Sequence, residues 1–210
     1  MLEVINLFCQ RGERVLFANV SFSLAAGECL HVRGSNGSGK TSLLRLMVGL
    51  APIELNEAAT THPNTPASIR WRGESLVDSV MREDLIYLGH HAAVNGDLTA
   101  LENLHFANAQ DGVPLAPVDA LAALRRMGLG GREDLPTRVL SAGQRRRVLL
   151  ARLLTRRAKL WVLDEAFTAL DVAAVKLLGE LLGEHLSAGG LAVLTSHQTL
   201  PVTNAQVLEL

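Results

Sequence analysis

Alternating apolar and polar residues mark the first part of the chain. In residues 15–24 the apolar side chains occupy every second position: Leu16, Ala18, Val20, Phe22 and Leu24. This period of two predicts a half-buried strand with those side chains facing a core. Short strands are also predicted over 29–34, which ends in glycine, and over 68–76 and 84–90.

Helical spacing takes over in the later part. Apolar residues three and four positions apart predict helices over four segments: 41–50, 98–110, 117–129 and 172–190. Unbroken apolar runs at 158–167 and 191–197 are typical of buried parallel strands. Strands that alternate with helices indicate an α/β fold, with antiparallel strands added near the N-terminus.

Composition and charge narrow the class of protein. With 210 residues, 48% of them hydrophobic and 20% charged, the chain suits one globular domain with room for a subdomain. The net charge of −1 argues against bulk attraction to nucleic acid or lipid headgroups, so the arginines at 145–147 need a local explanation. Residues 51–68, rich in Pro, Thr and Asn, are expected to form a surface loop.

The sequence predicts a cytoplasmic chain that does not itself enter a membrane. No apolar run approaches the roughly 20 residues needed to span a bilayer, and the first residues lack the layout of a secretion signal. Cys9 and Cys29 lie in apolar strand-like stretches and are expected to be reduced, buried thiols.

Residues 34–41, GSNGSGKT, form a phosphate-binding pattern. They match G-x-x-x-x-G-K-[ST] between a predicted strand and a predicted helix. The glycines let backbone N–H groups wrap the β- and γ-phosphates, Lys40 adds a positive charge, and the Thr41 hydroxyl is expected to ligate Mg²⁺. We assign the nucleotide to this segment: Gly34, Ser35, Asn36, Gly37, Ser38, Gly39, Lys40, Thr41 and Ser42.

Two carboxylates end the apolar strand LWVLDE, residues 160–165. Opposite a phosphate loop, Asp164 is expected to hold Mg²⁺, and Glu165 is expected to be the general base that polarises an attacking water. His197 ends the next buried strand, where a contact with the γ-phosphate is available at the C-terminal edge of the sheet.

A second glycine-marked helix start lies in LSAGQRRRVLLARLL, residues 140–154. Ser141, Ala142 and Gly143 are small, and amide dipoles point outward at a helix start, so this is a candidate anion site. Asp171, in TALD, is expected to cap the helix that follows it. The residues alone leave open which anion the second site binds.

The order of these motifs resembles the ATP-binding subunits of ABC transporters over nearly the whole chain. It runs from the phosphate loop through LSAGQ, LWVLDE and TALD to His197. The resemblance implies a P-loop NTPase (RecA-like) core with an antiparallel β subdomain and a small helical subdomain. Residues 1–210 would form one ATP-binding domain, with the helical subdomain inserted at about 92–147.

The resemblance also answers the question of the second anion site. In this family two subunits meet head to tail, and the signature motif of one subunit caps the γ-phosphate held by the other. Ser141 and Gly143 would therefore serve the nucleotide of a partner subunit. Asp171 would contact nucleotide as well, and Glu165 and His197 would be the catalytic residues.

Three longer segments resemble the ATPases of haem exporters in bacterial cytochrome c maturation: YLGHHAAVNGDLTALENLHF, LSAGQRRRVLLARLL and LWVLDEAFTALD. Two positions depart from the general family pattern. His90 stands where most relatives have a glutamine that contacts Mg²⁺ and the membrane partner. Arg11 stands where most have an aromatic residue that stacks on adenine, and an arginine plane stacks on a base more weakly. Ala142 and Ala166 replace a usual glycine and a usual proline without removing a donor or a charge, and at least one arginine of 145–147 is expected to face solvent or a partner's acidic residue.

The finer resemblance implies the cofactors, partners and location. The cofactors would be ATP and Mg²⁺, with Thr41, Asp164 and His90 at the metal. The partners would be membrane permease subunits of a haem-export complex and a second copy of the chain, with no nucleic acid. The chain would lie at the cytoplasmic face of the bacterial inner membrane, attached only through those partners.

Other functions remain open from the sequence. Another small importer or a lipid exporter would use the same motifs. ABC-type ATPases that act on nucleic acid or ribosomes normally carry two ATPase halves or a long coiled-coil insertion, and this chain has neither. A nucleotide-responsive module without catalysis is disfavoured by the intact Lys40, Asp164, Glu165 and His197.

Overall fold

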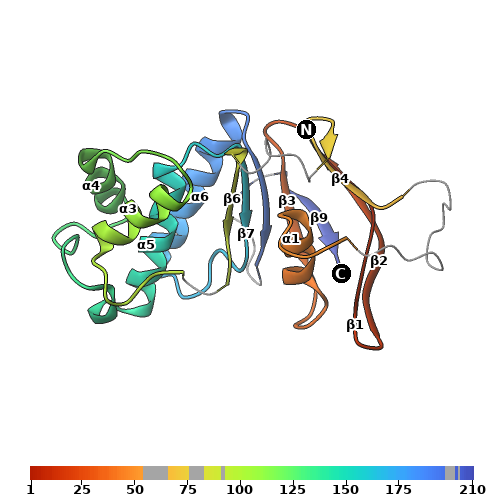
Figure 1. Cartoon of the computed structure of the whole chain (residues 1–210), viewed down its shortest axis with the longest axis horizontal. Helices are drawn as coiled ribbons and strands as arrows, with labels where there is room; N and C mark the ends of the chain where they lie inside the picture. The colour runs from red at the N-terminus through yellow and green to blue at the C-terminus, as the bar shows by residue number, and fades with distance from the viewer. Residues whose placement is uncertain (54–65, 76–82, 91–92, 197–201, 203) are drawn as a thin grey trace.

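The computed structural model describes residues 1–53, 66–75, 83–90, 93–196, 202 and 204–210. Figure 1 shows an antiparallel sheet at one end of the molecule, a parallel sheet in the middle and a group of helices at the other end. The early antiparallel strands and the later alternation of strands and helices agree with the predicted α/β class.

The antiparallel sheet comes from the N-terminal part. Its strands are β1 (Leu2–Arg11), β2 (Arg14–Leu24), β4 (Ser68–Trp71) and β5 (Glu74–Ser75), in the order β2-β1-β4-β5. The alternation predicted for β2 breaks at Asn19, which has a left-handed φ of 55° and lies at an irregularity in the β1–β2 register. An extra residue there shifts the pleat by one position. Phe17 is therefore buried and Ala18 exposed, so the prediction that Ala18 faces the core is wrong.

The single strand predicted over 68–76 is also wrong. Within the described part of this segment, β4 and β5 pair as an antiparallel hairpin. Arg72 and Gly73 between them have left-handed φ values of 54° and 88°, the backbone that a two-residue hairpin turn requires.

The parallel sheet has the order β6-β7-β8-β3-β9. Its strands are β6 (Leu85–Leu88), β7 (Leu160–Leu163), β8 (Leu191–Thr195), β3 (Cys29–Arg33) and β9 (Gln206–Glu209). Every residue of β7 and β8 is buried, as their unbroken apolar runs predicted. The hydrophobic pattern does not predict β9, which pairs with β3 at the sheet edge and is largely exposed.

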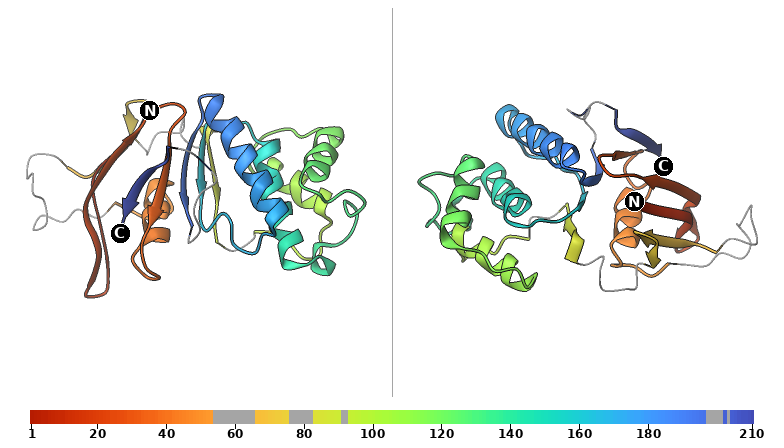
Figure 2. Two further views of the ribbon diagram at one scale, coloured as in Figure 1. Left: turned by 180° about the vertical axis from the view of Figure 1, so that it is seen from behind. Right: turned by 90° about the horizontal axis from the view of Figure 1, so that it is seen from above.

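Helices cover both faces of the parallel sheet (Figure 2). They are α1 (Lys40–Met47), α3 (Ala100–Gln110), α4 (Pro117–Arg126), the short η1 (Thr137–Val139), α5 (Ala142–Thr155) and α6 (Val172–Ser187). Helix α1 lies between the two sheets, where Leu43, Leu44 and Met47 share one core with Leu160 and Val162 of β7. The alternate residues of β7, Trp161 and Leu163, belong to a second core with the remaining α-helices.

Two general expectations can be compared with the structure. Cys9 and Cys29 are both buried and neither forms a disulfide, as predicted. Burial raises the pKa of the Cys29 thiol to about 12, so this thiol stays protonated and unreactive. Among the described residues, no helix is long and apolar enough to cross a membrane.

Candidate functional site

The phosphate-binding pattern forms the turn between β3 and α1. Gly34, Gly37 and Gly39 all have left-handed φ values. Gly39 precedes α1 without any side-chain cap, so the helix start is not closed by a side chain of its own. The left-handed φ of 109° favours glycine at position 39, and a Cβ there would lie in tight contact, 3.0 Å from a ring carbon of Phe17 in β2.

Two polar side chains at this turn have the chemistry to bind an anion. The Lys40 side chain is buried, and its Nζ donates to the carbonyls of Gly34 at 2.8 Å and Ser35 at 2.9 Å. Ser38 Oγ is buried and has no hydrogen-bond partner within the described part of the chain. Uncapped amides, a buried ammonium and an unsatisfied hydroxyl together favour a phosphate.

A pocket of about 330 Å³ opens in front of this turn. Its lining combines the turn and α1 with residues from the antiparallel sheet and the end of β7: Arg11, Leu16, Asn36, Gly37, Gly39, Lys40, Thr41, Ser42, Arg45 and Glu165. Three cationic side chains and one carboxylate give it a positive balance, which suits an anionic ligand. Arg11, the predicted adenine platform, therefore lines the same pocket as the phosphate turn.

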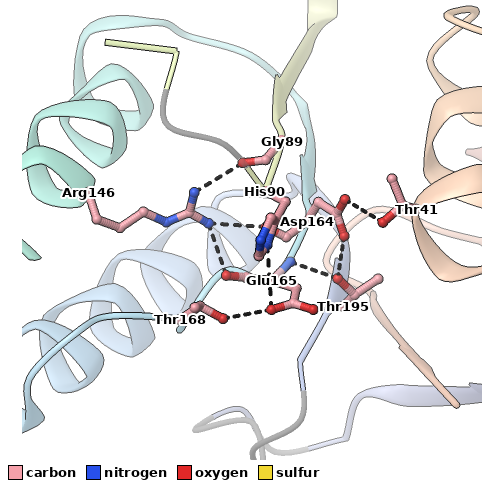
Figure 3. A network of polar contacts seen from close by, with 8 residues as sticks. All are labelled: Thr41, Gly89, His90, Arg146, Asp164, Glu165, Thr168 and Thr195. Atoms are coloured by element: carbon pink, nitrogen blue, oxygen red, sulfur yellow. Dashed lines mark hydrogen bonds and ion pairs between the residues drawn. The ribbon is translucent and has the colours of Figure 1, made fainter. Parts of the chain in front are cut away.

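Asp164 follows β7 and faces the start of α1 (Figure 3). It is 1% exposed, and its Oδ2 accepts a 2.8 Å hydrogen bond from Thr41 Oγ1. Its Oδ1 accepts from Thr195 Oγ1 at 2.8 Å, at the end of β8. The two residues predicted from separate motifs to hold Mg²⁺ thus touch, although 123 positions separate them in the chain.

Glu165 extends from the next position into the same region. Its φ of 48° is left-handed, which is unusual for a residue with a side chain. Its backbone N–H donates to Thr195 Oγ1 at 2.7 Å, and Oε2 accepts from Thr168 Oγ1 at 2.9 Å. His90 Nδ1 lies 3.6 Å from the same Oε2. The structure therefore brings Glu165, the predicted base, next to His90, the predicted contact for Mg²⁺ and the membrane partner.

The three arginines after the signature motif have separate contacts. Arg145 donates to the carbonyl of Leu140 at 2.6 Å, and Arg147 pairs with Asp171. Arg146 is 5% exposed and hydrogen-bonds backbone carbonyls at the ends of β6 and β7. Burial lowers its pKa, and the nearby Asp164 and Glu165 oppose this shift. Sequence reasoning missed the role of Arg146, because a run of arginines does not reveal which one turns inward.

The start of α5 is closed by its own side chains. Ser141 Oγ accepts from the Gln144 N–H at 3.2 Å, and Gln144 Oε1 accepts from the Ser141 N–H at 3.0 Å. This capping box leaves Ser141 exposed, with its hydroxyl proton available to donate. A Cβ on Gly143 would lie 3.0 Å from the carbonyl of Ala169, so the signature turn packs closely against the segment before α6.

Asp171 caps α6, as predicted, by accepting from the Ala174 N–H at 2.8 Å. This hydrogen bond and the neighbouring Arg147 lower the pKa of its carboxyl group. Among the described residues that line the phosphate pocket, Ser141, Gly143 and Asp171 do not appear. His197, the other predicted catalytic residue, lies outside the described residues.

Comparisons with known proteins agree with this geometry. A family profile described as ABC transporter matches residues 17–168. The chain is 48% identical to the cytochrome c biogenesis ATP-binding export protein CcmA of Dechloromonas aromatica (strain RCB), over 100% of the chain and 98% of that protein. It is 44% identical to the CcmA of Escherichia coli (strain K12), over 99% of the chain and 94% of that protein.

Solved structures share the fold. An ABC transporter ATP-binding protein from Pyrococcus furiosus superposes with a TM-score of 0.81 at 20% identity, over 100% of this chain and 96% of that one. An ATP-binding cassette solved as a dimer in a post-hydrolysis state with ADP and Pi superposes with a TM-score of 0.75 at 22% identity, over 94% of this chain and 88% of that one. The P-loop NTPase architecture with added antiparallel strands is therefore confirmed.

Proposed function

The chain belongs to the ABC transporter family, and we propose that it is the ATP-hydrolysing subunit of a haem exporter that serves cytochrome c biogenesis. Its activity is ATP hydrolysis coupled to transport. The assignment to cytochrome c biogenesis rests on relatives that match the chain from end to end at 44–48% identity. We propose membrane permease subunits as partners, which would hold the chain at the cytoplasmic face of the inner membrane.

One observation carries the hydrolytic function: the hydrogen bond from Thr41 to Asp164 next to a pocket that Glu165 lines. Both oxygens are hard donors of the kind that Mg²⁺ prefers, so these residues fit the ion, and His90 is a further proposed contact. When bound, Mg²⁺ neutralises charge on the β- and γ-phosphates.

Residues of the chain itself would then have separate roles in the reaction. Lys40 exchanges its contacts with the Gly34 and Ser35 carbonyls for phosphate oxygens. Glu165 accepts a proton from the water that attacks the γ-phosphorus; the bond to the bridging oxygen breaks, and ADP and inorganic phosphate form. We propose that His197 contacts the γ-phosphate and that Arg11 stacks on adenine.

We propose a head-to-tail homodimer for the closed state. Ser141 and Gly143 are not among the described residues that line the pocket of their own chain, and the exposed Ser141 hydroxyl keeps a proton to donate. In such a dimer each ATP would lie between one phosphate turn and the partner's signature motif, with two equivalent sites around a twofold axis. Asp171 would reach the same interface. Within the single domain 1–210, residues of about 92–147 would form the helical subdomain.

Deletion of the gene tests the cellular role. Holocytochrome c should disappear while other haem proteins stay at normal levels. Lys40→Met should fail to restore it, whereas the matched control Lys176→Met, an exposed lysine 79% accessible on α6, should restore it fully. Normal c-type cytochromes in the deletion strain would refute the assignment to cytochrome c biogenesis.

A further inference from the structure

Arg146 joins three parts of the site that the chain brings from distant positions. It lies in the second turn of α5, and one terminal nitrogen donates to the carbonyl of Gly89 at 3.0 Å, after β6. The other donates to the carbonyls of Asp164 at 3.1 Å and Glu165 at 3.0 Å, after β7 (Figure 3). From this geometry we propose that Arg146 is a positioning residue for hydrolysis, which fixes the peptide that carries Glu165 and ties it to the signature helix.

The Glu165 peptide needs such support. Strand β7 ends at Leu163, and Glu165 has a left-handed φ of 48°, a backbone that persists in a residue with a side chain only when its surroundings hold it. Thr195 Oγ1 holds the N–H of Glu165 on one side, and Arg146 holds its carbonyl on the other. Together they set the direction in which the Glu165 side chain leaves the backbone.

The contacts of Arg146 suit positioning better than stability. Burying a guanidinium opposes folding, and its Nε has no hydrogen-bond partner among the described residues. The three acceptors of its hydrogen bonds are neutral carbonyls, while the Asp164 carboxylate accepts from Thr41 and Thr195 instead. A planar guanidinium spans two strand ends with two separate nitrogens, whereas lysine offers all its donors from one nitrogen.

The same helix links Arg146 to the second anion site. Ser141 caps α5 little more than one turn before Arg146. This part of the inference rests on the proposed function: when the partner's nucleotide engages Ser141, a shift of α5 moves the carbonyl of Glu165 through Arg146. The base of one subunit is thus adjusted by the nucleotide of the other.

The test compares Arg146→Lys with Arg152→Lys in the full chain. Arg152 is a matched control, because it lies on the same helix, is 18% exposed and pairs with Asp111 rather than with the strand ends. Arg146→Lys should lower kcat about 10- to 100-fold, with the Kd for Mg·ATP within about twofold of wild type. Hydrogen exchange should accelerate at the amides of Asp164 to Ala166 in this variant only.

Several outcomes would overturn the inference. They are an unchanged kcat in Arg146→Lys, a Kd that rises in step with the loss of kcat, or an equal loss in Arg152→Lys. If Arg146→Lys does not fold, Arg146→Gln keeps an amide donor without the buried charge and gives the same comparison. If wild type binds ATP but does not hydrolyse it, the proposed function fails. The positioning role is tested separately by hydrogen exchange, and equal exchange rates in Arg146→Lys and Arg152→Lys would refute it.

Discussion

Two helices start at the candidate anion sites, α1 at Lys40 and α5 at Ala142, and their first turns are completed in different ways. Gly39 gives α1 no side-chain cap, and the buried Lys40 folds back on carbonyls of its own turn. Ser141 gives α5 a complete capping box with Gln144. One start opens into a cationic pocket and the other lies exposed on the surface.

On the proposed function, this difference would give one chain two anion sites of unequal strength. The amides of α1 have no side-chain cap, so a bound phosphate completes that helix start. The start of α5 is already complete, and it offers only a hydroxyl proton and the dipole of the helix. A site of the first kind binds alone, whereas a site of the second kind adds to a phosphate that another surface already holds.

The largest expected effect is a loss of ATP hydrolysis without a loss of ATP binding at the α1 site. Glu165→Gln keeps the size and hydrogen bonds of the side chain but cannot accept the water's proton, so kcat should fall about 10²- to 10⁴-fold. The Kd for Mg·ATP, measured by calorimetry, should stay within about twofold of wild type. With ATP and Mg²⁺ present, light scattering should show a lasting dimer, which wild type forms only briefly. Hydrolysis close to the wild-type rate would show that another group is the base.

The second prediction concerns a variant that disrupts the proposed anion site at the start of α5 and leaves the α1 site unchanged. In the Glu165→Gln background, Ser141→Arg places bulk at the facing phosphate and should abolish the ATP-dependent dimer, while the ATP affinity of the monomer is retained. Ser187→Arg, at the exposed end of α6, is the matched control and should leave the dimer intact. If the Ser141→Arg double variant loses ATP binding as a monomer, the signature motif acts within its own chain.

The sequence indicates the candidate α1 site because neighbouring residues form most of it. The glycines, Lys40 and Thr41 are adjacent, and the apolar run before Asp164 identifies a buried parallel strand without any tertiary information. Strand β9 has no such signal, since pairing with β3 rather than burial defines it. Ala18 was misplaced because a single bulged residue, Asn19, reverses which side chains face the core.

Contacts between distant segments account for what the sequence does not show at the site. Arg145 to Arg147 are identical in type, and only the fold shows that one bonds strand ends, one bonds Leu140 and one pairs with Asp171. The approach of His90 to Glu165 also depends on tertiary structure, because β6 and β7 are neighbours only in the sheet. The role of His197 stays a prediction.

A smaller effect measures the capping box itself. Ser141→Ala removes the side-chain acceptor at the start of α5 and should lower the free energy of unfolding by about 1 kcal/mol. Ser141→Asp keeps an acceptor and adds a charge that favours a helix N-terminus, so its stability should match wild type while its dimer is lost through repulsion from phosphate. Urea denaturation without nucleotide gives both values. Equal stability of Ser141→Ala and wild type would mean that the capping box contributes nothing.

The smallest effect concerns the adenine side of the α1 pocket. Arg11 is exposed at the end of β1 and lines the pocket from the antiparallel sheet, so any stacking on the base is weak. Arg11→Ala should therefore raise the Kd for ATP only about two- to fivefold. Arg11→Tyr should tighten binding, because an aromatic ring gives the base a larger surface for stacking. Arg14→Ala is the control, since Arg14 pairs with Arg11 across the β1–β2 hairpin and does not line the pocket. A tenfold or larger loss of ATP affinity in Arg11→Ala, measured by calorimetry, would mean that the guanidinium binds phosphate rather than adenine. Arg11 would then be a fourth contact for the phosphates, beside the α1 amides, Lys40 and Ser38.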